Sequence, residues 1–194
     1  MRKKISLTEK EQFALIQNAN HDELLKFISD NLSFHFTENA SKVFVERGNS
    51  EEILAYISTR SLAERGEIAL IKRGVHNEIL AYTQKYKLCE SAEKALIQRG
   101  VETEILAYLE INSFCANAMV DLIYRGNIDE IEKAARRSSF GFKAENELIN
   151  FGVHRHIMAY IKIRKFCSEE ALKAFFKRGN ESEIVLYKFL YEAQ

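Results

Sequence analysis

The chain has 194 residues and 46% of them are hydrophobic, which is enough for one soluble domain with a sizeable core. Its 28 basic and 28 acidic side chains cancel, and this argues against a dedicated nucleic-acid-binding domain, because such domains are usually strongly basic. No apolar run approaches the roughly 20 residues that cross a bilayer, and three cysteines fit a reducing compartment, so we expect a cytoplasmic protein without a membrane span.

The sequence predicts a series of similar repeat units, described below. Each unit contains two short helices, which we call helix A and helix B. The chain opens with a helix over about residues 8–17 that behaves like a helix B, and a degenerate helix A follows at 23–27. In the first full repeat we expect helix A over about 49–59 and helix B over about 63–72, because their apolar residues have helical spacing. The last expected helix, over about 182–193, is again a helix A.

The repeat has a period of 26 residues. Its clearest mark is an Arg-Gly pair, found at Arg47-Gly48, Arg73-Gly74, Arg99-Gly100 and Arg125-Gly126. The series continues with Gly152, which follows Phe151, and with Gly179, which follows Arg178 after an interval of 27 residues. Self-similarity at such a period is the signature of a repeat architecture.

Signals at the helix ends recur with the same period. Asn49, Asn127 and Asn180 each precede a glutamate by three residues, which is the form of a capping box at the start of helix A. The glycine after helix B suits a left-handed C′ position. A small residue in helix B, which lets neighbouring helices approach closely, recurs as Ala40, Gly66, Ala92, Ala118, Ala144 and Ala171.

One helix pair cannot bury its apolar face alone, whereas stacked pairs can, and this predicts an all-α fold. We expect a right-handed α-α superhelix, an α-solenoid of about six to seven two-helix repeats, in one domain over residues 1–194. The expected units lie near residues 21–46, 47–72, 73–98, 99–124, 125–150, 151–177 and 178–194.

The paired helices, with their periodic small and apolar columns, resemble the HEAT and armadillo-like α-solenoids in a shortened form. HEAT units are longer and often carry a proline in the first helix, and this chain has neither feature. The resemblance covers almost the whole chain. It implies a scaffold that binds proteins or, in a few cases, nucleic acid.

Residues that could carry chemistry mostly occupy repeat positions. Cys89, Cys115 and Cys167 share one position at the start of helix B. Equivalent positions in stacked helices lie about 10 Å apart, which is too far for a disulfide, so we interpret this column as packing. The alternative is a reactive thiol at a helix N-terminus. His154 and His156 point in different directions on a helix and make a poor metal site. Because no catalytic motif is present, we expect no enzymatic activity, cofactor or metal.

An arginine column and a glutamate column flank the turn between helix B and the next helix A. The arginines are Arg47, Arg73, Arg99, Arg125 and Arg178, and the glutamates are Glu52, Glu78, Glu104, Glu130 and Glu183. We interpret both columns as partners of the helix dipoles, with the arginine of one repeat also pairing with the glutamate of a neighbour. The alternative is a row of arginines that binds a ligand.

An aromatic column lies on helix A, at Phe27, Tyr56, Tyr82, Tyr108, Tyr160 and Tyr187. The favoured interpretation is packing at the edge of the core, with the hydroxyl toward water or a backbone acceptor. The alternative is an exposed stripe that binds a partner, for which Tyr56, Tyr82, Tyr108 and Tyr160 are the candidates.

The unit at residues 125–150 departs from the others, because Glu132 and Ala134 stand where other units have leucine and tyrosine. Residues 125–165 hold nine basic and five acidic side chains, a net charge of +4. Drift in one unit and a functional surface explain the departure equally well. As a surface, its basic side chains Lys133, Arg136 and Arg137 would suit an acidic protein or a phosphate.

Two functional hypotheses follow. The first is a non-enzymatic protein-interaction scaffold that binds a partner through its concave face and the basic segment 125–165. The alternative is a nucleic-acid-binding α-solenoid that uses the same segment.

Overall fold

The computed structural model describes residues 6–192, and these residues form 14 α-helices and no strand. The chain divides into two compact units, Met1–Ala95 and Leu96–Gln194. The helices are α1 (Glu9–Asn18), α2 (His21–Asp30), α3 (Glu38–Arg47), α4 (Ser50–Ile57), α5 (Glu64–Arg73), α6 (His76–Thr83), α7 (Glu90–Arg99), α8 (Glu102–Ile111), α9 (Ala116–Arg125), α10 (Ile128–Arg137), α11 (Gly141–Phe151), α12 (His154–Ile161), α13 (Glu169–Arg178) and α14 (Glu181–Tyr191).

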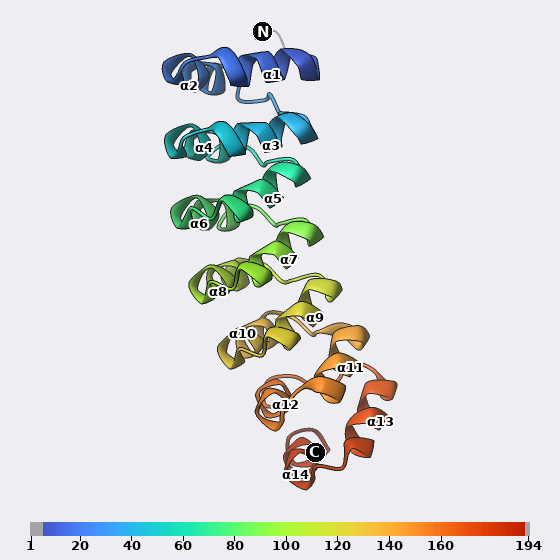
Figure 1. Ribbon diagram of the computed structural model, residues 1–194. Coiled ribbons are helices and arrows are strands. Elements are labelled where there is room, and N and C mark those ends of the chain that lie inside the picture. Colours follow the sequence, from blue (N-terminus) through green and yellow to red (C-terminus); the bar gives the residue numbers. More distant parts are fainter. Residues whose placement is uncertain (1–5, 193–194) are drawn as a thin grey trace. The chain divides into compact units, whose positions relative to one another are not determined.

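In the first unit, each helix packs against the next helix but one in the sequence, so that α1 packs on α3 and α2 on α4. The B helices α1, α3 and α5 pack in series, and the A helices α2, α4 and α6 pack in a second series (Figure 1). Phe44 and Leu70 on the B helices and Ile53 and Ile79 on the A helices are fully buried. The apolar columns of the sequence therefore form the core of this unit.

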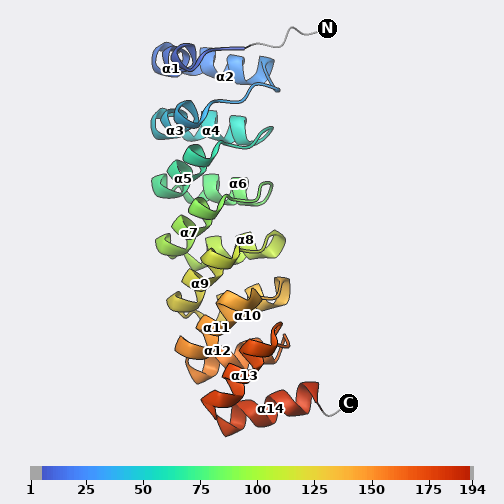
Figure 2. The same ribbon diagram turned by 90° about the vertical axis from the view of Figure 1, so that its right-hand side faces the viewer.

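The second unit repeats this arrangement. The B helices α9, α11 and α13 pack in series, and the A helices α8, α10, α12 and α14 form the other series (Figure 2). Leu122 and Leu148 on the B helices and Ile105 and Ile157 on the A helices are fully buried. Neighbouring helices thus pack in series as the sequence predicts, in an α-solenoid of about seven helix pairs.

The capping boxes are present in part. At Asn49 the box is complete, because the side chain accepts from the N–H of Glu52 and the Glu52 carboxylate accepts from the N–H of Asn49. Asn127 and Asn180 cap their helices in the same way. Their glutamates bind Arg125 and Arg178 instead of completing the box.

The left-handed glycine is found at four of the six positions, with φ between 71° and 75° at Gly74, Gly100, Gly126 and Gly179. The expectation is wrong for Gly48 and Gly152, whose φ values are −59° and −65°. At Gly152 the constraint is space, since a Cβ there would lie 2.2 Å from the carbonyl oxygen of Leu148.

The glycine of the small-residue column has its own cause. A Cβ at Gly66 on α5 would lie 2.1 Å from Oγ of Ser41 on α3, so no larger residue fits beside this serine. Ser41 is buried, and its hydroxyl accepts a hydrogen bond from the N–H of Ala63 just before α5. The pair Ser41 and Gly66 thus sets the close approach of α3 and α5.

Candidate partner-binding surface

The arginine and glutamate columns form ion pairs across four of the turns. Arg73 pairs with Glu78 at 3.2 Å, Arg125 with Glu130 at 2.9 Å and Arg178 with Glu183 at 3.4 Å. Arg99 and Glu104 pair in the same way, at 2.9 Å. Each of these four glutamates is buried. The arginine therefore pairs with the glutamate of its own turn, and the expected pairing with a neighbour's glutamate is corrected.

The same arginines join consecutive repeats through the backbone. Arg73 donates to the carbonyl of Val45, Arg125 to that of Gly100 and Arg178 to that of Ile149. Burial raises the pKa of Glu130, and the hydrogen bond and charge of Arg125 oppose that rise. These guanidinium groups are thus engaged within the fold.

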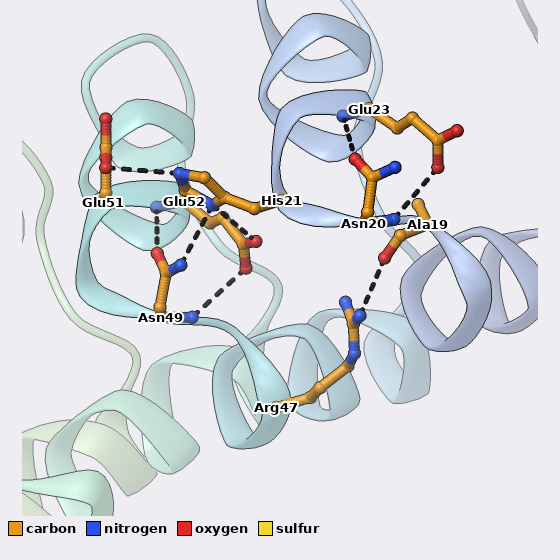
Figure 3. A network of polar contacts seen from close by, with 8 residues as sticks. All are labelled: Ala19, Asn20, His21, Glu23, Arg47, Asn49, Glu51 and Glu52. Atoms are coloured by element: carbon orange, nitrogen blue, oxygen red, sulfur yellow. Dashed lines mark hydrogen bonds and ion pairs between the residues drawn. The ribbon is translucent and has the colours of Figure 1, made fainter.

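The first turn of this kind uses a histidine in place of the arginine (Figure 3). Nδ1 of His21 lies 3.0 Å from Oε1 of Glu52, and Nε2 lies 3.3 Å from Glu51. Arg47 donates instead to the carbonyl of Ala19, at 2.8 Å. The hydrogen bond to Glu52 is the main cause that raises the pKa of His21.

At the turn after α11 both members of the ion pair are replaced. Phe151 stands in place of the arginine and is 63% exposed, with its ring 5.7 Å from that of Tyr124. His156 stands in place of the glutamate and is buried against Gly126. Burial lowers the pKa of His156, which favours the neutral ring. The two replacements thus remove both charges of the Arg–Glu pair from this turn.

The tyrosine column lies inside the fold. Tyr56, Tyr82, Tyr108 and Tyr160 are at most 1% exposed, so the hypothesis that they form a partner-binding stripe is corrected. Packing explains them, and they lie in the core rather than at its edge. Their side chains and those of Lys133, Arg136 and Arg137 do not form one surface.

A second, buried glutamate column binds two of these tyrosines, Tyr82 and Tyr160, and the sequence interpretation missed it. The Tyr82 hydroxyl donates to Glu67 at 2.6 Å, and the Tyr160 hydroxyl donates to Glu145 at 2.5 Å. The same carboxylates accept from the backbone N–H groups of Cys89 and Cys167. Burial is the main cause that raises the pKa of both tyrosines. The signal was available, because each glutamate precedes its tyrosine by 15 residues.

The repeat at 125–150 lacks both the tyrosine and its glutamate partner. Met119 occupies the glutamate position and Ala134 the tyrosine position, again 15 residues apart, and both are buried. An apolar side chain next to an alanine leaves no polar group without a partner. This part of the departure is therefore compensated within the core.

Two of the cysteines support the packing interpretation, because Cys89 and Cys115 are half-buried, whereas Cys167 is exposed. None of the three forms a disulfide, and Cys115 caps α9 by accepting from the N–H of Ala118. Burial is the main cause that raises the pKa of Cys89 to about 12 and that of Cys167 to about 11. Because the thiolate is the reactive form, these shifts argue against the reactive-thiol alternative.

The three basic candidates all lie on α10 and each has a contact in the second unit. Lys133 pairs with Glu110 of α8, and Arg137 donates to the carbonyl of Ile111 at the end of α8. Arg136 reaches Glu132 at 3.6 Å, and its side chain is 67% exposed. Arg136 is thus the candidate whose charge is most available to a partner.

Three surface grooves lie beside this helix. Two lie between α8 and α10: the larger is lined by Leu106, Glu110, Asp129, Glu132, Lys133 and Arg136, and the smaller by Leu109, Glu110, Lys133, Arg136 and Arg137. The third, between α10 and α12, has a volume of about 340 Å³ and is lined by Ile128, Glu132, His154, Arg155, Met158, Ala159 and Lys162. Arg155 and Lys162 are exposed. The surface along α10 and α12 therefore combines basic side chains with small apolar patches.

Side chains that could bind a metal ion do not cluster in the described part of the chain. Among residues 6–192, no three His, Cys, Asp or Glu side chains cluster so that they could hold a metal ion. His154 pairs with Glu183 at 2.9 Å, whereas His156 is buried against Gly126, so the two histidines diverge.

The helices formed by residues 6–192 are 8 to 11 residues long, and none has the length or apolar character to span a membrane.

Comparisons with family models, with curated proteins and with solved structures find no match to this chain. The assignment as a helical-repeat solenoid therefore rests on the packing of the helices described above.

Proposed function

We propose that this chain is a non-enzymatic protein-interaction scaffold of the HEAT and armadillo-like kind, acting in the cytoplasm. Its second unit would bind an acidic segment of a partner protein along α10 and α12. The observation that supports this proposal is the pair of exposed cations Arg155 and Lys162, which line the groove between these two helices. The exposed Arg136 adds a third cation, on the groove at the α8 side of α10.

The chemistry of this groove favours a peptide over a bare anion. Met158 supplies apolar area between Arg155 and Lys162, and this area would be covered by an apolar side chain of the partner. Rim cations steer an acidic partner toward the surface and fix its orientation. Binding should therefore weaken with salt, but not vanish, because the apolar contacts are not screened.

The test is an affinity capture from a cell lysate followed by mass spectrometry, with the full chain immobilised. The variant Arg136→Ala, Arg155→Ala, Lys162→Ala removes three exposed cations from this surface. The matched control Lys165→Ala, Lys173→Ala, Lys177→Ala removes three exposed cations from the same unit. We expect the wild type and the control to capture acidic proteins that the first variant does not capture.

A second variant, Lys133→Ala, Arg136→Ala, Arg137→Ala, tests the residues that the sequence singled out. Because Lys133 and Arg137 also contact α8, its unfolding curve must be compared with that of the wild type. An identical set of captured proteins for all variants would contradict the proposal. Retardation of RNA in a low-salt gel shift, lost at high salt, would favour the nucleic-acid alternative.

A further inference from the structure

The first unit has a groove of its own, between the B helices α3 and α5. Its volume is about 530 Å³, within the range of ligand pockets, roughly 300–1,000 Å³. It is lined by Lys42, Glu46, Arg65, Ile68, Ala69, Lys72 and Arg73. This groove lies on B helices, whereas the surface proposed above lies on A helices of the other unit.

The rim of this groove, called the α3/α5 groove from here on, is strongly basic. Four of its lining side chains are cationic, and Glu46 is the single carboxylate among them. Lys42 lies 3.6 Å from Glu46, and both are about half exposed. Among the described residues, Lys72 has no hydrogen-bond or ion-pair partner. The groove therefore carries positive charge that the fold does not neutralise.

Two of the cations are held in place by the fold. The Arg65 guanidinium donates to Oδ1 of Asn39 on α3, at 2.5 Å. Arg73 is fixed by Glu78 and by the carbonyl of Val45. Cations that are already ordered lose less side-chain entropy when a ligand binds.

The floor of the α3/α5 groove is apolar. Ile68 is half-buried and Ala69 is buried, and both come from α5. The close contact between Gly66 and Ser41 brings α5 near to α3. An apolar floor between basic walls is complementary to a chain that places a large apolar side chain between carboxylates.

We propose that the α3/α5 groove binds an acidic peptide segment of a partner protein, with a leucine or phenylalanine on Ile68 and carboxylates at Lys42, Arg65 and Lys72. A free phosphate would leave the apolar floor uncovered. A nucleic acid would need a track of cations, but the corresponding positions of α9 and α11 hold Val120, Glu147 and Asn150, with Lys143 as the cation.

The experiment selects peptides from a random 12-residue display library on the immobilised full chain and measures the affinity of the best clone by fluorescence anisotropy. We expect enriched peptides with two or more acidic residues beside Leu or Phe. Lys42→Glu with Lys72→Glu should weaken the binding of that peptide at least tenfold. Ile68→Ser should weaken it about fivefold, since one buried apolar contact is lost.

The chain supplies matched controls. Lys173 and Lys177 on α13 occupy the same repeat positions as Lys42 and Lys72, and Lys173 also pairs with a glutamate one turn away. The double variant Lys173→Glu, Lys177→Glu should bind the peptide like the wild type. The variant Val120→Ser, at the repeat position of Ile68, should do the same. Each variant is first shown to unfold at the wild-type denaturant concentration.

Three outcomes would overturn the proposal. The selection could enrich no acidic peptide, or the Lys42 and Lys72 charge reversal could leave the affinity unchanged. A labelled single-stranded RNA could bind instead, with a steep salt dependence and no response to Ile68→Ser. The variant Arg136→Ala, Arg155→Ala, Lys162→Ala keeps the α3/α5 groove intact, so failure here and failure of the function proposed for the second unit are distinguishable.

Discussion

The hydroxyl of Tyr82 donates a hydrogen bond of 2.6 Å to Glu67, and the same carboxylate accepts from the N–H of Cys89. One buried glutamate on α5 thus binds α6 and the residue that precedes α7. Glu145 makes the equivalent contacts with Tyr160 and Cys167 in the second unit. The stacking of helix pairs is therefore tied together by a polar contact inside the core as well as by apolar packing.

Replacing Tyr82 by Phe should lower the free energy of unfolding by about 1–3 kcal/mol, because the buried Glu67 carboxylate loses a hydrogen-bond donor. Chemical denaturation measures this loss. The control is Tyr124→Phe, which removes a bond of 2.6 Å between an exposed hydroxyl and Glu147. At the surface the loss should stay within about 0.5 kcal/mol. Equal losses for the two variants would show that Glu67 does not depend on Tyr82.

The same network can be tested by installing it at Met119 and Ala134. Met119→Glu alone should destabilise the chain by about 2 kcal/mol or more, since it buries a carboxylate without a partner. Ala134→Tyr alone overpacks the core at a cost of roughly 1–3 kcal/mol. Together they should be less destabilising than their sum by about 1–3 kcal/mol, measured in a double-mutant cycle. Additive losses would mean that the two positions are not coupled.

The Arg125–Glu130 pair predicts a pH dependence. Removing Arg125 by Arg125→Ala deletes the group that opposes the rise of the Glu130 pKa. A carboxyl whose pKa is higher in the folded than in the unfolded state takes up protons on folding, so its contribution to stability falls as pH rises above the unfolded pKa of about 4.3. The stability deficit of the variant should therefore be larger at about pH 7.5 than at about pH 5.

Thermal unfolding at the two pH values measures this difference. The double variant Arg125→Ala, Glu130→Gln removes the titrating group and serves as the control, with a deficit that stays constant over the same window. A deficit of the single variant that grows on acidification would contradict the assigned direction.

For His21 we expect the opposite pH dependence: the stability deficit of a His21 variant should shrink as pH rises. Its pKa is raised in the folded state by Glu52, so the contribution of its charged form to stability is fully present below the unfolded pKa of about 6.5 and is lost as pH rises through the folded pKa. His21→Gln should lower the melting temperature more at about pH 5.5 than at about pH 8.5. The exposed His35, replaced in the same way, is the control and should show no such trend. A constant difference between wild type and His21→Gln would count against the pairing with Glu52.

The helix pairs could be predicted from the sequence because the signals are local and repeated. The 26-residue period placed α4 and α5 within two residues of their observed bounds, and Asn49 and the Arg-Gly pairs marked the helix ends. At Gly48 and Gly152 the same signal misled, because a glycine can be required by a crowded carbonyl as well as by a positive φ.

The candidate site was harder to predict, because it depends on contacts between repeats. Tyr56 and its equivalents share a helical face with the core isoleucines, and their burial became clear only from neighbours such as Phe36, whose N–H binds the Tyr56 hydroxyl. Glu67 and Glu145 would be expected at the surface from residue type alone. The α3/α5 groove joins side chains from two neighbouring repeats of the first unit, and the 26-residue period does not specify how these repeats are placed against each other.

The contact between Ser41 and Gly66 has a consequence for how such an array could be assembled or rebuilt. The repeats are alike in sequence but are not interchangeable, because a block with alanine at the place of Gly66 would collide with Ser41, and the Gly66 block placed after another neighbour would lose the contact that shaped it. The junction between α3 and α5 thus depends on two side-chain positions that must match. Moving or deleting either of these two repeats would require its neighbour to be changed as well.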